Sequence, residues 1–455
     1  MISPEPSSNI SRRGFLAAGA TAAVAAAATA FAPGRLLAAL EKDRAPMPDL
    51  STWANVRAQF QLSPNQLHFS NFFIASHPKP VRDAIDSYRR VIDSEPFLAV
   101  DTRMFQSETD NLQLRIRDDL APYLGANRDE IALTGNTTTG LALFYAGLRL
   151  SRGDEILTTD QDHYSHHESI RFATERAGAA MRKVVLYADP GNATREEVTR
   201  NLRAAIRPNT RVVGLTWVHS STGVCLPIRA LADVVDEANR GRTDENRILL
   251  MVDGAHGLGA VDESVGSLGC DFFSAGTHKW MLGPRGTGIL WGQTDRWARL
   301  RPTIPTFASL EAFNAWMRGD TNPRPVTAYD VTPGGFHAYE HQWAMSAAFK
   351  LHEAIGRPRA SGRIRDLNTR LKDGLAAMRQ VKLRTPRDPA MSAGLVCFEV
   401  AGASNADVVR RLLDKRIIAS TAPYAKDYVR LSPSLVNNEA EVDAALRAVA
   451  EIAGT

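Results

Sequence analysis

Three side chains that can do chemistry together follow one another in the middle of the sequence. Asp253 comes directly after the apolar run 248–252, His256 follows three residues later, and the pair His278 and Lys279 comes further along. Ligands of open α/β sheets bind beyond the carboxyl ends of the strands, so we expect Asp253 at the mouth of a site. Pyridoxal phosphate (PLP) needs a lysine for its aldehyde, an acid for its ring nitrogen and a donor to its phenolic oxygen. This set of residues therefore indicates a PLP site.

Each of these residues, taken alone, also has an ordinary structural explanation. A single Asp after a strand is most often a helix cap or a turn residue, and a single Lys is usually a solvated surface charge. Lys279, however, is followed by Trp280, Met281 and Leu282. Apolar surroundings lower the pKa of an amine and keep it nucleophilic near neutral pH, so the combination favours the functional interpretation.

A glycine- and threonine-rich turn offers a cradle for a phosphate. It covers residues 134–140, between a predicted strand and a helical stretch that begins at Leu141. Its backbone N–H groups and hydroxyls can face an anion at the positive end of that helix. A turn of this kind can also merely cap the helix, so it supports a phosphate site without establishing one.

The elements that must position these residues follow an alternating pattern. Short apolar or β-branched runs alternate with helical stretches, at 131–133, 155–159, 184–187, 211–218, 248–252 and 287–291. The run 248–252 is apolar at consecutive positions, which is typical of a strand covered on both faces of a parallel sheet. The central part is therefore predicted to be α/β.

The pattern changes after about residue 325. Helical or strand-like stretches are found at 343–356, 367–378, 394–400, 406–413, 428–431 and from 439 onward. They predict a smaller α+β domain. We therefore expect an N-terminal segment at 41–78 that packs on the small domain, a large domain at 79–325 that opens with an amphipathic helix from Val81, and a small domain at 326–455.

The first 40 residues are predicted to be an export signal. Arg12 and Arg13 lead into an alanine-dominated, uncharged run at 14–34, with small residues at 28–30 and 38–39 as possible cleavage sites. Alanine contributes little transfer free energy, which disfavours a membrane anchor. We expect the twin-arginine pathway to carry the protein to the periplasm or otherwise out of the cytoplasm.

Composition excludes several classes of protein. The 455 residues are 44% hydrophobic, which argues against disorder, and a net charge of +4 without a Lys/Arg block gives no reason to expect a nucleic-acid partner. Cys225, Cys270 and Cys397 are too few for a disulfide framework and are expected to be buried. The predicted ligand is a small molecule.

The motifs together resemble the class V aminotransferase fold of PLP-dependent enzymes. The likeness rests on Asp253-x-x-His256, on His278-Lys279-Trp280 with the segment 284–288, and on the threonine-rich turn, and it extends from about residue 64 to the C-terminus. It implies fold type I, in which a mostly parallel seven-stranded sheet covered by helices is joined to a smaller α+β domain. Cysteine desulfurases, kynureninase and isopenicillin N epimerase have this fold.

The resemblance assigns a role to each residue around the cofactor ring. It makes Lys279 the lysine that binds the cofactor aldehyde, Asp253 the partner of the pyridine nitrogen and His256 the group near the phenolic oxygen. His163 occupies the position of a ring stacked on the cofactor. Ser220 opens the segment 220–223, which is similar to the epimerase branch, and is expected near the cofactor.

The resemblance also implies contacts to the phosphate and the substrate. Thr137 and Thr138 would hold the phosphate with help from Thr277 or His278, and Arg430 would hold the substrate α-carboxylate. The family usually takes a Gly-Thr pair from the neighbouring subunit for the phosphate. This chain has Tyr339 and Glu340 there, which we expect to shape the substrate pocket instead.

The predicted function is that of a homodimeric enzyme acting at the α-carbon of an amino acid or amino-acid-derived substrate, in the isopenicillin N epimerase-like branch. A periplasmic transaminase, an enzyme that tailors the siderophore pyoverdine and a PLP-dependent lyase remain alternatives, as does an inactive binding protein. Desulfuration is disfavoured because the segment 418–423 lacks a cysteine. His163, His166, His167 and Glu168 could be metal ligands, but no second cluster accompanies them, and no metal is predicted.

Overall fold

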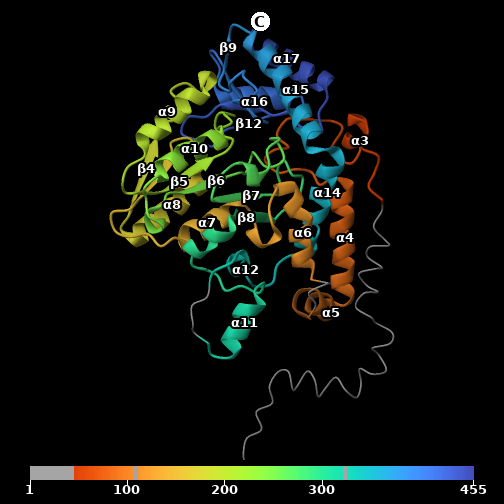
Figure 1. Ribbon diagram of the computed structural model, residues 1–455. Helices are drawn as coiled ribbons and strands as arrows, with labels where there is room; N and C mark the ends of the chain where they lie inside the picture. Colours follow the sequence, from red (N-terminus) through yellow and green to blue (C-terminus); the bar gives the residue numbers. More distant parts are fainter. Residues whose placement is uncertain (1–45, 107–110, 321–324, 455) are drawn as a thin grey trace, which may run out of the picture.

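A seven-stranded sheet forms the centre of the larger part of the molecule (Figure 1). The computed structural model describes residues 46–106, 111–320 and 325–454. The strands are β2 (Ile131–Thr134), β3 (Glu155–Thr159), β4 (Ala180–Val184), β5 (Thr210–Thr216), β6 (Leu249–Asp253), β7 (Phe272–Gly276) and β8 (Gly288–Gly292). Their order is β2-β8-β7-β6-β5-β3-β4, and all neighbours are parallel except at β8, which is antiparallel to β2 and β7. The predicted mostly parallel α/β sheet is confirmed.

Two strands differ from the sequence prediction. β4 ends at Val184, where the predicted strand 184–187 begins. It is an edge strand with partly or fully exposed side chains, so it lacks the apolar run that marks a buried strand. β7 was not recognised as a strand, although it lies between β6 and β8 and is buried along its length.

Helices cover both faces of this sheet. They are α4 (Lys79–Ser94), α6 (Leu112–Leu124), α7 (Thr137–Gly147), α8 (Tyr164–Ala177), α9 (Arg195–Ala205), α10 (Ile228–Asn239), α12 (Ala328–Val331), α13 (Tyr339–Trp343) and α14 (Met345–Ile355). Two further helices, α5 (Pro96–Asp101) and α11 (Leu310–Met317), project from the end of the large domain (Figure 1). Successive residues of β6 alternate between two hydrophobic clusters, Leu249 and Met251 in one with α7 and α8, Leu250 and Val252 in the other with α4, α6, α10 and α14. This two-sided burial explains the consecutive apolar positions at 248–252.

A second sheet forms the smaller domain, at the end of the molecule that carries the C-terminus (Figure 1). Its elements are α15 (Arg357–Ala376), β9 (Val381–Leu383), β10 (Val396–Val400), α16 (Asn405–Asp414), β11 (Ile417–Ile418), β12 (Ser420–Thr421), β13 (Val429–Leu431) and α17 (Glu439–Ala453). The strands β12-β13-β10-β9 are antiparallel, and the three helices share a hydrophobic core with them.

The division between the two cores lies later in the chain than the predicted boundary at residue 326. The helices α13 and α14 pack on α4 and α6 of the large domain, and α15 contributes Ile364 to the large core and Leu367 to the small one. Because α15 packs against both cores, the spacing of its apolar residues shows no break. The sequence pattern therefore does not mark the domain boundary.

The N-terminal segment connects the two domains. The helix α3 (Trp53–Arg57) contributes Val56 to the large core, whereas β1 (Leu67–His68) pairs with β11 and is followed by Phe69 in the small core. The predicted signal peptide at 1–40 lies outside the described residues. Within the described residues no helix is long and apolar enough to cross a membrane. All three cysteines are buried, as predicted.

Candidate active site

The candidate site lies where parallel strands of the large sheet end. Asp253 is the last residue of β6, and Lys279 follows three residues after the end of β7, the neighbouring parallel strand. The chain passes against the ring of Phe273 directly after Asp253, where only a glycine, Gly254, leaves room. Lys279 reaches back toward this turn, and its Nζ lies 3.1 Å from Nε2 of His256. Parallel strands thus bring together the lysine, acid and histidine that the sequence singled out.

The contacts of His256 define its protonation state. The indole Nε1 of Trp280 donates to Nδ1 of His256 at 3.3 Å. An indole N–H can only donate, so Nδ1 accepts and a neutral His256 carries its proton on Nε2. That N–H then faces Nζ of Lys279, which can accept it only as a neutral amine. The geometry therefore favours an unprotonated, nucleophilic lysine.

The electrostatics of the site agree with this arrangement. Burial lowers the pKa of Lys279 to about 8; Asp253 opposes this effect and Arg430 adds to it. Burial raises the pKa of Asp253 to about 6, against the opposing N–H of Ala255 and the charge of Lys279. At pH 7 Asp253 is thus mostly ionised, while about a tenth of Lys279 is neutral, far more than of an exposed lysine.

We expect Lys279 in the cofactor-free protein to become reactive at lower pH than an exposed lysine. Only the neutral amine attacks an acylating reagent, so its modification should rise with a midpoint near pH 8. Ordinary exposed lysines have a pKa of about 10.4. Peptide mass spectrometry after brief acylation across a pH series measures both classes in one sample. A Lys279 midpoint equal to that of the exposed lysines would contradict the effect of burial.

The start of α7 provides the predicted anion cradle. Asn136 accepts from the N–H of Thr139, while the N–H groups of Thr137 and Thr138 donate to no group in the described part of the chain. The hydroxyl of Thr137 accepts from the N–H of Gly276 at 2.8 Å. Two free N–H groups at the start of an eleven-residue helix suit a phosphate.

The two further phosphate candidates are placed differently. His278 lies beside the cradle, with Gly276 between them. A side-chain carbon at Gly276 would be 2.9 Å from the ring of His278 and 3.4 Å from the backbone nitrogen of Thr137. Thr277 is fully buried, and its hydroxyl bonds to Thr287 and to the carbonyl of Pro284. Of the pair, His278 is the residue available to an anion, whereas the Thr277 side chain holds the loop together.

His163 lies near the reactive groups at the start of α8. It caps this helix, with Nδ1 accepting from the N–H of Ser165 at 3.2 Å. Burial and the nearby charge of Lys279 lower the pKa of His163, so the ring is neutral at pH 7. A neutral ring fixed by its own helix cap suits the stacking position that the resemblance implies.

Arg430 brings the small domain into the site. Its guanidinium lies 5.0 Å from the ring centre of Phe72 and donates to the carbonyls of Ser220 and Thr421 and to the hydroxyl of Ser420. Arginine has five N–H donors, so one on each terminal nitrogen remains for a carboxylate. The hydroxyl of Ser220 bonds to Tyr424 at 2.6 Å, so Ser220 links the large domain to the loop before β13.

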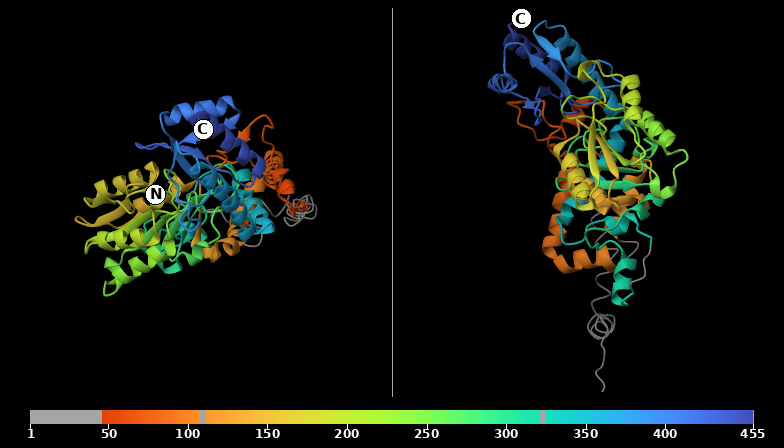
Figure 2. Two further views of the ribbon diagram at one scale, coloured as in Figure 1. Left: turned by 90° about the horizontal axis from the view of Figure 1, so that it is seen from above. Right: turned by 90° about the vertical axis from the view of Figure 1, so that its left-hand side faces the viewer.

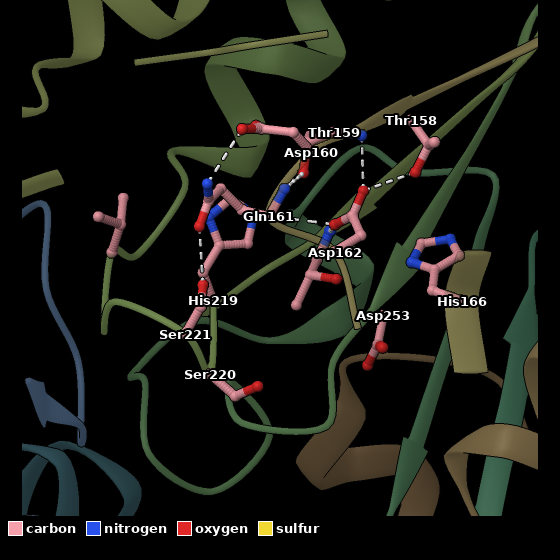
Figure 3. A network of polar contacts seen from close by, with 12 residues as sticks. Thr158, Thr159, Asp160, Gln161, Asp162, His166, His219, Ser220, Ser221 and Asp253 are labelled. Atoms are coloured by element: carbon pink, nitrogen blue, oxygen red, sulfur yellow. Dashed lines mark hydrogen bonds and ion pairs between the residues drawn. The ribbon is translucent and has the colours of Figure 1, made fainter. Parts of the chain in front are cut away.

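A buried network around Asp162, the residue before His163, was missed by sequence reasoning (Figure 3). Asp162 accepts from the hydroxyl of Thr158 at 2.6 Å and from the N–H groups of Thr159 and Thr216 at 2.7 and 2.9 Å. It therefore ties the ends of β3 and β5 together next to the start of α8. Its position directly before His163 was the one available signal, but a single Asp after a strand has many explanations.

Tyr339 and Glu340 do not join Lys279 within this chain. Tyr339 is buried, stacks on Trp343 with ring centres 5.5 Å apart and donates to the carbonyl of Gly335. Glu340 makes no hydrogen bond or ion pair with any described residue. The short helix α13 faces the large core through Tyr339, so this residue has a packing role in the single chain.

The histidines considered as metal ligands have other partners. His166 bonds to Tyr145 at 2.6 Å, His167 bonds to the carbonyl of Thr159, and Glu168 pairs with Arg171. Among the described residues, no group of three or more His, Cys, Asp or Glu side chains is placed to hold a metal ion.

Comparison with known proteins decides the family. The model of the family "Aminotransferase class-V" matches residues 75–444. The chain belongs to the class V aminotransferase family. The predictions of fold type I, of an enzyme and of PLP are confirmed at the level of this family.

Relatives of this class V chain carry out more than one reaction. Isopenicillin N epimerase of Amycolatopsis lactamdurans is 26% identical over 88% of this chain and 99% of its own length. A probable cysteine desulfurase of Pyrococcus abyssi is 25% identical over 80% of this chain and 86% of its own. Among solved structures, a variant of C-DES with glycine covalently linked to its PLP cofactor has a TM-score of 0.74 at 24% identity, covering 87% of this chain and 99% of that one.

Proposed function

We propose that this protein is a PLP-dependent enzyme that acts at the α-carbon of an amino acid or amino-acid-derived substrate, in the manner of isopenicillin N epimerase. The observation that carries the proposal is the contact of Lys279 with His256 beside the buried Asp253. An amine with a lowered pKa next to a buried carboxyl is the pair of groups that this chemistry needs.

The described side chains fit the cofactor at both of its ends. One oxygen of Asp253 accepts from the N–H of Ala255 at 2.9 Å, and the other accepts from no described group, so it is available to a ring N–H. The free N–H groups of Thr137 and Thr138 with His278 would hold the phosphate. When bound, PLP supplies an aldehyde that condenses with amines and a protonated ring that accepts the electron pair left at the α-carbon.

The protein's own residues then position the substrate and move its proton. The two free donors of Arg430 hold the α-carboxylate, which places the α-carbon near Lys279. The neutral amine of Lys279 takes the α-proton and can return it. The rings of Phe72 and Trp280 stack with centres 6.4 Å apart, and both contact His256, the partner of this amine.

The cysteines support an outcome other than desulfuration. Each of the three is buried, and burial raises the pKa of Cys225 and Cys397 to about 12. Cys397 pairs with Arg430 across β10 and β13, at the back of the site. A thiol with so high a pKa is a poor nucleophile. The isopenicillin N epimerase relatives match this chain over nearly their whole length, which favours epimerisation.

Product analysis with holoprotein tests the proposed function. The protein is incubated in deuterated water with L- and D-amino acids, with and without a keto-acid acceptor, and with a pyoverdine precursor. Deuterium at the α-carbon together with the opposite enantiomer supports epimerisation. Keto acid without racemisation would instead assign a transaminase, and loss of a β-substituent a lyase. A colourless protein that cannot bind PLP would leave only a binding protein of the same fold.

We further propose export by the twin-arginine machinery. The support is the arginine pair and the uncharged alanine-rich run that follows it. Replacing Arg12 and Arg13 with lysine should retain the protein in the cytoplasm of a host with this pathway, because the pair is the feature that the pathway reads. Fractionation and immunoblotting measure the distribution. Active, uncleaved parent protein in the cytoplasm would contradict the proposal.

We also propose that the enzyme is a homodimer. The helices α5 and α11 lie at the end of the molecule opposite the small domain (Figure 2). These helices and neighbouring segments carry exposed aromatic side chains, several in ring contact with one another: Phe97, Phe105, Phe307, Phe313, Trp316 and Phe336. Trp316 is 69% exposed and Phe336 is 78% exposed. Monomers rarely expose so large an apolar surface, and two-fold pairing would cover it on both copies.

Light scattering tests the dimer. The parent protein should have twice the mass of one chain, whereas the double variant Trp316→Glu, Phe336→Glu should shift toward the monomer. The control is Tyr164→Glu, because Tyr164 is equally exposed but lies on α8, outside this surface. A monomeric parent, or a double variant that remains dimeric, would argue against this interface.

A further inference from the structure

A small cavity lies between the N-terminal segment and the loop that follows Lys279. Its volume is about 260 Å³, and its lining includes His68, Ser70, Asn71, Ser76, Arg285 and Ile418. The described residues that line it include one permanent cation, Arg285, and no carboxylate. A water molecule takes about 30 Å³ of liquid volume, so the cavity can hold a polar group on a short aliphatic chain.

Residues next to the lining of this cavity contact the candidate active site. Phe72 follows Asn71 in the chain, and its ring lies 5.8 Å from that of His256. The N–H of Ala75 donates to the carbonyl of His278 at 2.8 Å. On the opposite wall, Ile418 is two residues before Ser420, whose hydroxyl accepts from Arg430 at 3.2 Å. The two sides of the cavity are therefore connected through adjacent residues to His256 and to Arg430.

Two polar side chains of the cavity, Arg285 and Asn71, have N–H groups that donate to no described residue. Arg285 makes one long hydrogen bond, 3.4 Å to the carbonyl of Ala75, and no ion pair with a described residue. Asn71 is only 8% exposed; its oxygen accepts from the N–H of Ser76, while its NH₂ group donates to no described residue. A guanidinium and an amide with unused N–H groups, and no acid nearby, match a carboxylate.

We propose that this cavity is the subsite for a second, distal carboxylate of the substrate, which Arg285 and Asn71 recognise. The inference rests on the proposed function, because it requires an amino acid held by Arg430 at the α-carboxylate. A subsite of this kind limits the proposed substrates to amino acids, or amino-acid-derived groups, that carry an acidic group at the end of a short side chain. Arg285 and Asn71 thus determine specificity and take no part in moving the proton.

Binding to the holoprotein tests this subsite. L-Glutamate and L-2-aminoadipate are compared with their uncharged analogues L-glutamine and L-norvaline, and the dissociation constant is read from the change in cofactor absorbance. A hydrogen bond to a charged group changes affinity by about tenfold to a hundredfold, so the parent should prefer the diacids by that factor. In Arg285→Ala the preference should vanish, with affinity for L-norvaline unchanged.

Matched variants separate the subsite from other effects. Arg285→Lys keeps the charge and should retain part of the preference, Asn71→Leu should reduce it, and Ser70→Ala, in the same cavity, should leave it intact because Ser70 donates to the carbonyl of Ile418. Equal affinity of the parent for diacids and analogues would overturn the subsite. So would weaker PLP binding by Arg285→Ala with the preference unchanged, which would place Arg285 at the cofactor phosphate. A parent that binds PLP but responds to no amino acid would overturn the proposed function itself.

Discussion

We expect Lys279→Ala to lose both the covalent attachment of PLP and catalytic turnover. Lys279 is the amine beside His256, and burial holds its pKa at about 8, so its removal takes away the nucleophile and the proton carrier together. Loss of the proton transfer alone should lower kcat by about 10² to 10⁴-fold. Borohydride reduction followed by peptide mapping should place the cofactor on the Lys279 peptide of the parent and on no peptide of the variant.

Two controls make this result specific. Lys279→Arg keeps a positive charge but has no primary amine, so it should fail in the same way. Lys372→Ala removes a different lysine, a buried one that bonds to the carbonyls of Pro386 and Arg387, and should lower stability while the cofactor stays attached. Reduced cofactor on Lys279→Ala, with normal turnover, would show that another amine does the chemistry.

The fold was predictable where burial leaves a pattern in the sequence. β6 is covered on both faces and therefore reads as a continuous apolar run, and α4 shows its buried positions at helical spacing after a proline. The edge strand β4 has no buried face, and α15 packs against two cores. The structure of these two elements depends on where they pack in the tertiary structure. The local sequence therefore shows no pattern that predicts it.

The site was predictable where the chain itself brings the residues together. Asp253 and His256 share one turn, and Lys279 follows the next parallel strand, so their meeting follows from the direction of the strands. The bond from Trp280 to His256 depends on side-chain orientation, and the link between Ser220 and Tyr424 joins two domains. Neither contact has a spacing that could reveal it.

The residues assigned only by resemblance differ in whether their side chains face the candidate site. Arg430 lies against Ser220 as a group in the site would, because β13 is fixed in the core of the small domain. Thr277 turns inward to Thr287, and Tyr339 packs on Trp343. A motif fixes the backbone position of a residue, but the direction of its side chain depends on neighbours that differ between relatives.

We expect Asp253→Asn to keep the cofactor and lose most of the activity. The asparagine oxygen can still face a ring nitrogen, but it carries no charge, so it no longer favours the protonated ring that accepts electrons from the α-carbon. Removing one preorganised electrostatic contact costs about 10² to 10³-fold in kcat. Burial raises the pKa of Asp253 to about 6, so the parent is ionised at pH 7 and the comparison there is between charge and no charge.

The design of this experiment separates charge from packing. Asp253→Glu restores a carboxylate and should recover part of kcat, whereas Asp253→Ala should be as slow as Asp253→Asn. Asp271→Asn is the matched control, because Asp271 is also buried but lies at the start of β7, where it bonds to the N–H of Leu250 and pairs with Arg296. That end of the strand faces away from the site, so this variant should lose stability in thermal unfolding while kcat stays near that of the parent. Equal losses of kcat in the Asp253 and Asp271 variants would contradict this prediction. They would mean that Asp253 only stabilises the sheet and does not interact with the cofactor ring.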